Sequence, residues 1–128
     1  MRKPYRRNTD PNPIPIGIAI REASKSPMQI RVGAVLFKDR TILGTGYSHH
    51  PTYSNPDKRT SIHAEQATLV GLRHDIISGS DIVIVRLGKS GNLLPVQPCE
   101  RCVALLKKKG VRKVHCWTQD MDLTSVTL

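Results

Sequence analysis

The chain has 128 residues, of which 38% are hydrophobic and 4% aromatic, and 20 Lys and Arg residues against 10 acidic ones give a formal net charge of +10. This length is typical of one domain, and because no stretch approaches the roughly 18–20 apolar residues that span a bilayer, no membrane protein is predicted. Three cysteines cannot all pair with one another, which argues against a disulfide framework and favours reduced thiols or metal ligands in a cytoplasmic protein.

Residues 1–13 hold four basic side chains against one acidic one, and prolines interrupt the stretch. We expect a flexible basic arm here, followed by a single domain over residues 14–128. No apolar segment follows the basic residues, so a secretory signal is not predicted. The arm is suited either to contact phosphates or to remain a solvated terminus.

The first half of the domain begins with a helix and a hairpin. Apolar residues at helical spacing predict a helix over residues 16–25. Two runs rich in β-branched residues, 30–37 and 41–47, predict an antiparallel hairpin. The stretch 48–60, with its two prolines, is predicted to be a loop.

The second half alternates helices and strands. Apolar positions predict the longest helix over residues 61–74, and the continuous apolar run 81–87 is typical of a strand buried on both faces. A helix over 100–109 ends at Gly110, and a strand follows over 111–117. The last eleven residues have room for one more strand or a tail. The alternation of helices and strands predicts an α/β domain with a partly parallel sheet.

Two short segments combine metal-ligand residues with helix starts: His63-Ala64-Glu65 and Pro98-Cys99-Glu100-Arg101-Cys102. Two cysteines at this spacing can face one point, where the positive end of the helix dipole stabilises their thiolates. His63 supplies a third zinc ligand if the two helix N-termini lie side by side. Three protein ligands leave a fourth position for a water whose pKa zinc lowers to roughly 7, and Glu65 is placed to shuttle its proton.

A closed structural zinc site is the alternative interpretation, with Cys116 or His115 as the fourth ligand. It leaves Glu65 without a role. We expect Cys116, in the apolar run KVHCW, to be a small core residue. His115 should then point to the opposite face of its strand.

The two segments together resemble the signature of the zinc-dependent cytidine and deoxycytidylate deaminase superfamily, H-x-E followed by P-C-x-x-C. The order of elements is similar to that family over about residues 16–117. The resemblance implies a cytidine-deaminase-like α-β-α sandwich with a central mixed sheet of about five strands.

The resemblance also implies a hydrolase acting on a C–N bond of a cyclic amidine. Zinc would be held by His63, Cys99 and Cys102, and zinc-bound hydroxide would attack the amine-bearing carbon of the base. Glu65 would protonate the ring nitrogen and then the departing ammonia. The backbone amide of Ala64 and the carbonyl of Pro98 would contact the base or the zinc-bound oxygen.

Other substrate contacts are predicted in the loop before the zinc helix. Ser48 falls where many relatives carry an asparagine that contacts the sugar or base, and it retains a hydroxyl that can hydrogen-bond. His49 can take over that contact or bind a phosphate, and Tyr53 can stack on a base. A solvated histidine and an ordinary packed tyrosine are the alternatives.

The substrate predicted on this basis is a cytosine nucleoside or nucleotide. The alternative is deamination of cytosine or adenosine in single-stranded DNA or RNA. The charge of +10 favours this alternative, whereas five aromatic residues are few for a surface on which bases stack. A non-catalytic, zinc-stabilised nucleic-acid-binding module is the third hypothesis. The resemblance also implies a homo-oligomer.

Overall fold

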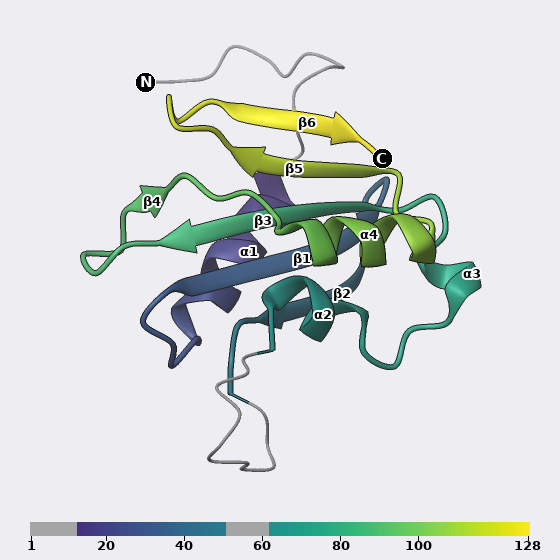
Figure 1. Ribbon diagram of the computed structural model, residues 1–128, viewed down its shortest axis with the longest axis horizontal. Coiled ribbons are helices and arrows are strands. Elements are labelled where there is room, and N and C mark those ends of the chain that lie inside the picture. The colour runs from purple at the N-terminus through teal and green to yellow at the C-terminus, as the bar shows by residue number, and fades with distance from the viewer. Residues whose placement is uncertain (1–12, 51–61) are drawn as a thin grey trace.

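The structure, a computed structural model, describes residues 13–50 and 62–128 (Figure 1). The predicted arm, except for its last residue, lies outside the described residues, and so does most of the predicted loop 48–60. The boundary between arm and domain therefore stays a prediction. No helix in the two described ranges is long and apolar enough to cross a membrane.

A mixed β-sheet forms the centre of the structure, with the strand order β2-β1-β3-β5-β6 and the short β4 paired to β3 (Figure 1). All neighbours in it are antiparallel except β3 and β5, which are parallel. The strands are β1 (Arg31–Lys38), β2 (Thr41–Tyr47), β3 (Asp81–Leu87), β4 (Leu93–Leu94), β5 (Lys113–Trp117) and β6 (Leu123–Thr127). The predicted α/β sandwich with a mixed sheet is confirmed.

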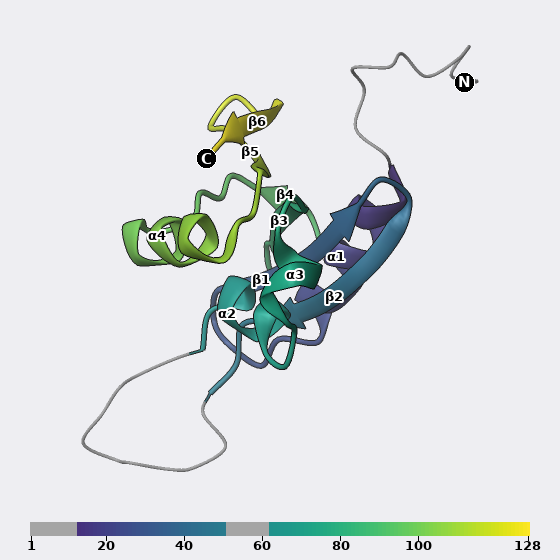
Figure 2. The ribbon, with the colours of Figure 1, turned by 90° about the vertical axis from the view of Figure 1, so that its right-hand side faces the viewer.

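Helices cover both faces of this sheet (Figure 2). Helix α1 (Pro13–Ser24) packs Ala19 and Ala23 against alternate residues of β1 and β3. On the opposite face, α2 (Ala64–Leu69) and α4 (Glu100–Lys109) bury Ala64, Leu69 and Leu106 with the other set of alternate strand residues. The alternation of side chains along β3 thus divides the core into two layers.

The long helix expected over residues 61–74 is not formed, and this prediction was wrong. Helix α2 ends at Leu69, and a separate turn of helix, α3 (His74–Ile77), follows. Gly71 adopts φ +79°, a left-handed conformation that glycine tolerates and that ends a helix. The apolar spacing continues past the point where the helix stops, but Val70, the first residue beyond it, is 76% exposed.

Most other boundaries agree with prediction within three residues. Helix α1 begins at Pro13, three residues before the expected start, because proline is tolerated in the first turn of a helix. The last eleven residues contain strand β6, and the stretch between β3 and α4 contains the two-residue strand β4. Helix α4 has the predicted bounds and ends at Gly110.

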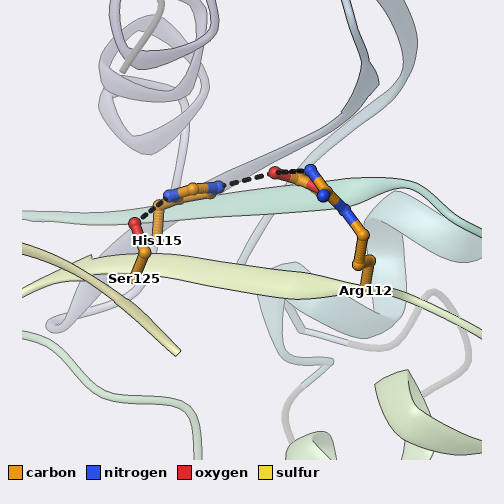
Figure 3. A network of polar contacts seen from close by, with 4 residues as sticks. Arg112, His115 and Ser125 are labelled. Atoms are coloured by element: carbon orange, nitrogen blue, oxygen red, sulfur yellow. Dashed lines mark hydrogen bonds and ion pairs between the residues drawn. The ribbon is translucent and has the colours of Figure 1, made fainter. Parts of the chain in front are cut away.

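A polar network ties β6 to the centre of the sheet (Figure 3). The buried carboxylate of Asp81 accepts hydrogen bonds from Arg112 Nε at 3.1 Å and His115 Nε2 at 2.8 Å. His115 Nδ1 contacts Ser125 Oγ at 2.6 Å, so the histidine joins β3 and β6 across β5. Its ring lies 5.8 Å from that of Phe37, which packs on the α1 side, whereas Cys116 belongs to the core on the other side. His115 and Cys116 therefore face opposite sides, as expected.

Candidate metal centre and active site

The sheet topology brings the starts of α2 and α4 to one edge. Strands β2 and β3 each run antiparallel to β1, so they run in the same direction. The chain leaves both strands at the same edge of the sheet and then enters α2 and α4 on the same face. The side-by-side helix starts expected from the sequence follow from this topology.

His63, Cys99 and Cys102 meet at this edge. His63 occupies the N-cap position of α2, Cys99 occupies the N-cap position of α4, and Cys102 lies in the first turn of α4. His63 Nδ1 is 3.3 Å from Cys102 Sγ and 3.6 Å from Cys99 Sγ, and the three ligand atoms lie within 4.8 Å of one another. The Gln66 side chain accepts a hydrogen bond of 2.9 Å from the His63 backbone, which holds the cap in place.

This donor set fits a zinc ion. One imidazole nitrogen and two sulfurs are ligands that zinc prefers, and its bond lengths put the ligand atoms of a tetrahedral site about 3.5–3.8 Å apart. The observed nitrogen–sulfur distances of 3.3 and 3.6 Å are close to that spacing. His63 and Cys99 are exposed while Cys102 is buried, so the group is open on one side.

The open side faces a cavity of about 630 Å³. Besides His63, Ala64, Glu65 and Cys99, residues line it from the segment before β1, from β1, β3 and β5, from just after β2 and β5, and from the stretch before α4: Met28, Gln29, Ile30, Val32, Ser48, Arg86, Pro95, Val96, Gln97, Trp117 and Gln119. The cavity is therefore large enough for an organic ligand beside the metal ligands.

Glu65 is buried beside the metal ligands, with 4% of its surface exposed. Burial raises the pKa of the Cys102 thiol well above its ordinary value, and the negative charge of Glu65 raises it further. Glu65 lines the same cavity as His63 and Cys99, so its carboxylate lies beside the donor set rather than in solvent. A carboxylate in this place can take up and release protons beside a metal-bound ligand.

The structure separates the predicted substrate contacts into three groups. Ser48 and Ala64 line the cavity together with His63 and Cys99. Pro98 and His49 adjoin lining residues without lining the cavity themselves, and His49 is held by a contact of 2.8 Å between its Nδ1 and the His50 carbonyl oxygen. Tyr53 lies outside the described residues.

Sequence reasoning did not identify Arg86 and Trp117 as residues of this site. Both line the cavity. Arg86 carried a signal, since it is the one charged residue inside the otherwise apolar run IVIVRL. Trp117 carried none, because a tryptophan at the end of a strand is equally typical of an ordinary core.

The alternative of a closed four-ligand site is not supported. Among the described residues, His63, Cys99 and Cys102 form the group that can hold a metal, without Cys116 or His115. Cys116 is 3% exposed in the core, where burial raises the pKa of its thiol. His115 is engaged with Asp81.

Residues 16–118 match the family model of the cytidine and deoxycytidylate deaminase zinc-binding region. The match covers most of the chain, and the site just described lies within it. The chain belongs to this deaminase family.

Individual relatives agree with that assignment. An uncharacterised deaminase from the luxG 3′ region of Aliivibrio fischeri is 28% identical over 111 residues, covering 80% of this chain and 67% of the relative. A deoxycytidylate deaminase of Mycobacterium phage D29 is 26% identical over 122 residues, covering 77% of this chain and 88% of the phage protein.

Solved structures share the fold. The apo dCMP deaminase of cyanophage S-TIM5 has a TM-score of 0.60 at 24% identity, covering 79% of this chain and 77% of its own. A cytidine deaminase from Burkholderia pseudomallei has a TM-score of 0.64 at 20% identity, covering 89% and 90%. At these sequence identities, the structural similarity shows that this chain shares the fold of the two deaminases.

Proposed function

We propose that this protein is a zinc-dependent hydrolytic deaminase that converts cytosine to uracil in a nucleoside or nucleotide. The observation that carries the proposal is the buried carboxylate of Glu65 beside the His63, Cys99 and Cys102 donor set, at the wall of a cavity of about 630 Å³. The similar phage protein is a deoxycytidylate deaminase, and the cyanophage enzyme has been solved in complex with dCMP and dUMP.

In this mechanism His63, Cys99 and Cys102 would hold zinc, which when bound would supply a water with a pKa lowered to roughly 7. Glu65 takes one proton of the attacking water on a carboxylate oxygen and passes it to the ring nitrogen of cytosine. It then passes the second proton of that water to the amine, whose bond to the ring carbon breaks. One water is consumed and one ammonia is released, so atoms and charge balance. Ala64, the first residue of α2, lines the cavity and has a backbone N–H without a partner inside the helix, and this N–H holds the base. The Pro98 carbonyl, between the lining residues Gln97 and Cys99, is the second backbone group expected to contact it.

The test is ammonia release by zinc-loaded protein from cytidine, deoxycytidine and their monophosphates, with adenosine, guanine and short single-stranded DNA and RNA beside them. We expect release from a free cytosine compound. Glu65→Gln should lower turnover by at least about 100-fold, since a positioned proton-transfer group contributes roughly 10²–10⁴-fold. The same variant should keep its zinc, measured as metal content per chain.

Normal turnover by the Glu65→Gln variant would contradict the mechanism, whereas loss of zinc would show that Glu65 is needed to build the site. Release from oligonucleotides alone would favour the second candidate, a nucleic-acid-editing deaminase. The observation that favours this candidate is the formal net charge of +10. Self-association and a cytoplasmic location stay predictions.

A further inference from the structure

Strand β3 places one charged side chain on the face that carries the active site. Ile82 and Ile84 belong to the core layer under α2 and α4, and Val83 and Val85 belong to the layer under α1. Because side chains alternate along a strand, Arg86 continues the row of Ile82 and Ile84. An arginine thus stands where the pattern of the strand calls for another apolar residue.

Arg86 forms no ion pair with an acidic side chain among the described residues. Its backbone pairs with Val32 of β1 and Leu94 of β4, and its side chain is half-buried. Its Nε is buried and has no hydrogen-bond partner in the described part of the chain.

A half-buried guanidinium without a partner is costly, because arginine stays charged at physiological pH and its donors have lost water. Arg86 lines the same cavity as His63, Glu65 and Cys99. A group that enters this cavity is therefore the partner available to it. An anion compensates both the charge and the unsatisfied donor, and a phosphate matches the planar fork of a guanidinium.

We propose that Arg86 is the anion-binding residue of this cavity and selects a substrate that carries a phosphate monoester, a nucleotide over the corresponding nucleoside. This inference rests on the proposed function, since it names the substrate class of the same site. Arg86 comes from β3 and the metal ligands come from the starts of α2 and α4, so phosphate binding and proton transfer belong to different residues.

Binding can be measured without turnover. Trp117, the single tryptophan of the chain, lines the cavity, so its fluorescence reports occupancy, and calorimetry checks the result. The probes are the reaction products uridine and deoxyuridine and their 5′-monophosphates, added to zinc-loaded protein. We expect the wild type to bind the monophosphates more tightly than the nucleosides. Arg86→Gln should weaken monophosphate binding about 10- to 100-fold and leave nucleoside binding unchanged.

Arg40→Gln is the matched control, because it removes the same charge from the exposed turn between β1 and β2, outside the cavity. Arg86→Lys keeps the charge but loses the fork, so it should retain part of the monophosphate affinity. Circular dichroism and zinc content show whether each variant is folded and loaded.

Two results would overturn the inference: equal affinity of the wild type for nucleoside and monophosphate, or equal weakening of both by Arg86→Gln. Arg86-dependent monophosphate binding without ammonia release would uphold the inference while the proposed function fails. Deamination of nucleoside and nucleotide alike, with no dependence on Arg86, would uphold the proposed function and overturn this inference.

Discussion

The Ser48 hydroxyl holds one wall of the cavity in place. Its Oγ accepts a hydrogen bond from the Val32 backbone N–H at 3.1 Å and lies 2.8 Å from Ser26 Oγ and 3.2 Å from the Ile30 carbonyl oxygen. Ser26 Oγ in turn donates to the Ser48 carbonyl at 2.6 Å. These contacts secure the segment just before β1, which lines the cavity.

Ser48→Ala should therefore lower the free energy of unfolding by about 1–3 kcal/mol, since it leaves buried polar groups without a partner. Urea denaturation measures this change. Ser90→Ala is the control, because Ser90 is exposed and its hydroxyl bonds only Asn92 within the described residues. If Ser48→Ala unfolds like the wild type but loses substrate affinity, Ser48 acts as the substrate contact predicted from the sequence and not as a structural residue.

At the residue scale, the part of the site that could be predicted consists of residues that are close together in the sequence. His63 and Glu65 are two residues apart and Cys99 and Cys102 three apart, so each pair is fixed by one helix start. The hydroxyl contacts of Ser48 join residues 16 to 22 positions apart. Such contacts follow from the tertiary fold, and no local pattern in the sequence encodes them.

At the scale of elements, the contact between β2 and α2 sets the position of the metal ligand His63. A Cβ atom added to Gly46 would lie 2.6 Å from the Thr68 backbone nitrogen and 2.9 Å from the Ala67 carbonyl carbon. Both are backbone atoms of α2, so no side-chain rotation relieves the clash. The helix rests directly on the strand because glycine is there.

Gly46→Ala should move α2 away from the sheet. We expect a loss of about 1–3 kcal/mol in the free energy of unfolding, typical of overpacking, and weaker zinc binding because His63 moves with the helix. Urea denaturation and competition with a colorimetric chelator measure the two effects. Gly17→Ala, in α1 with nothing within 4 Å of the added Cβ, should stabilise the protein slightly. Zinc affinity equal to that of the wild type in Gly46→Ala would show that α2 does not shift.

The extent of α2 shows why element boundaries were harder to predict than element types. Leu72 packs against the same core layer as Leu69 although it lies beyond the end of the helix. The turn at Gly71 therefore brings Leu72 back to the core. Leu69 and Leu72 are three residues apart, a spacing that is also typical of a helix. Apolar periodicity alone does not distinguish these two paths.

At the scale of the whole molecule, the donor set joins two parts of the chain that are distant in sequence. His63 follows the hairpin, whereas Cys99 and Cys102 follow β3, and both groups lie on one face of the sheet. A metal bound by all three side chains binds the folded chain and not the unfolded one, because only folding brings them within 4.8 Å. Zinc should therefore stabilise the entire domain.

Removing zinc with a chelator should lower the midpoint of thermal unfolding. A ligand at about 1,000 times its Kd stabilises a protein by about 4 kcal/mol, which for a chain of this size corresponds to roughly 10–20 °C. Cys99→Ser, at an exposed ligand, should abolish most of this zinc dependence. Cys116→Ala removes a buried sulfur outside the donor set, so it should lower stability yet keep the zinc dependence. A midpoint unchanged by the chelator, or equal loss of zinc dependence in both variants, would contradict a zinc site built from His63, Cys99 and Cys102.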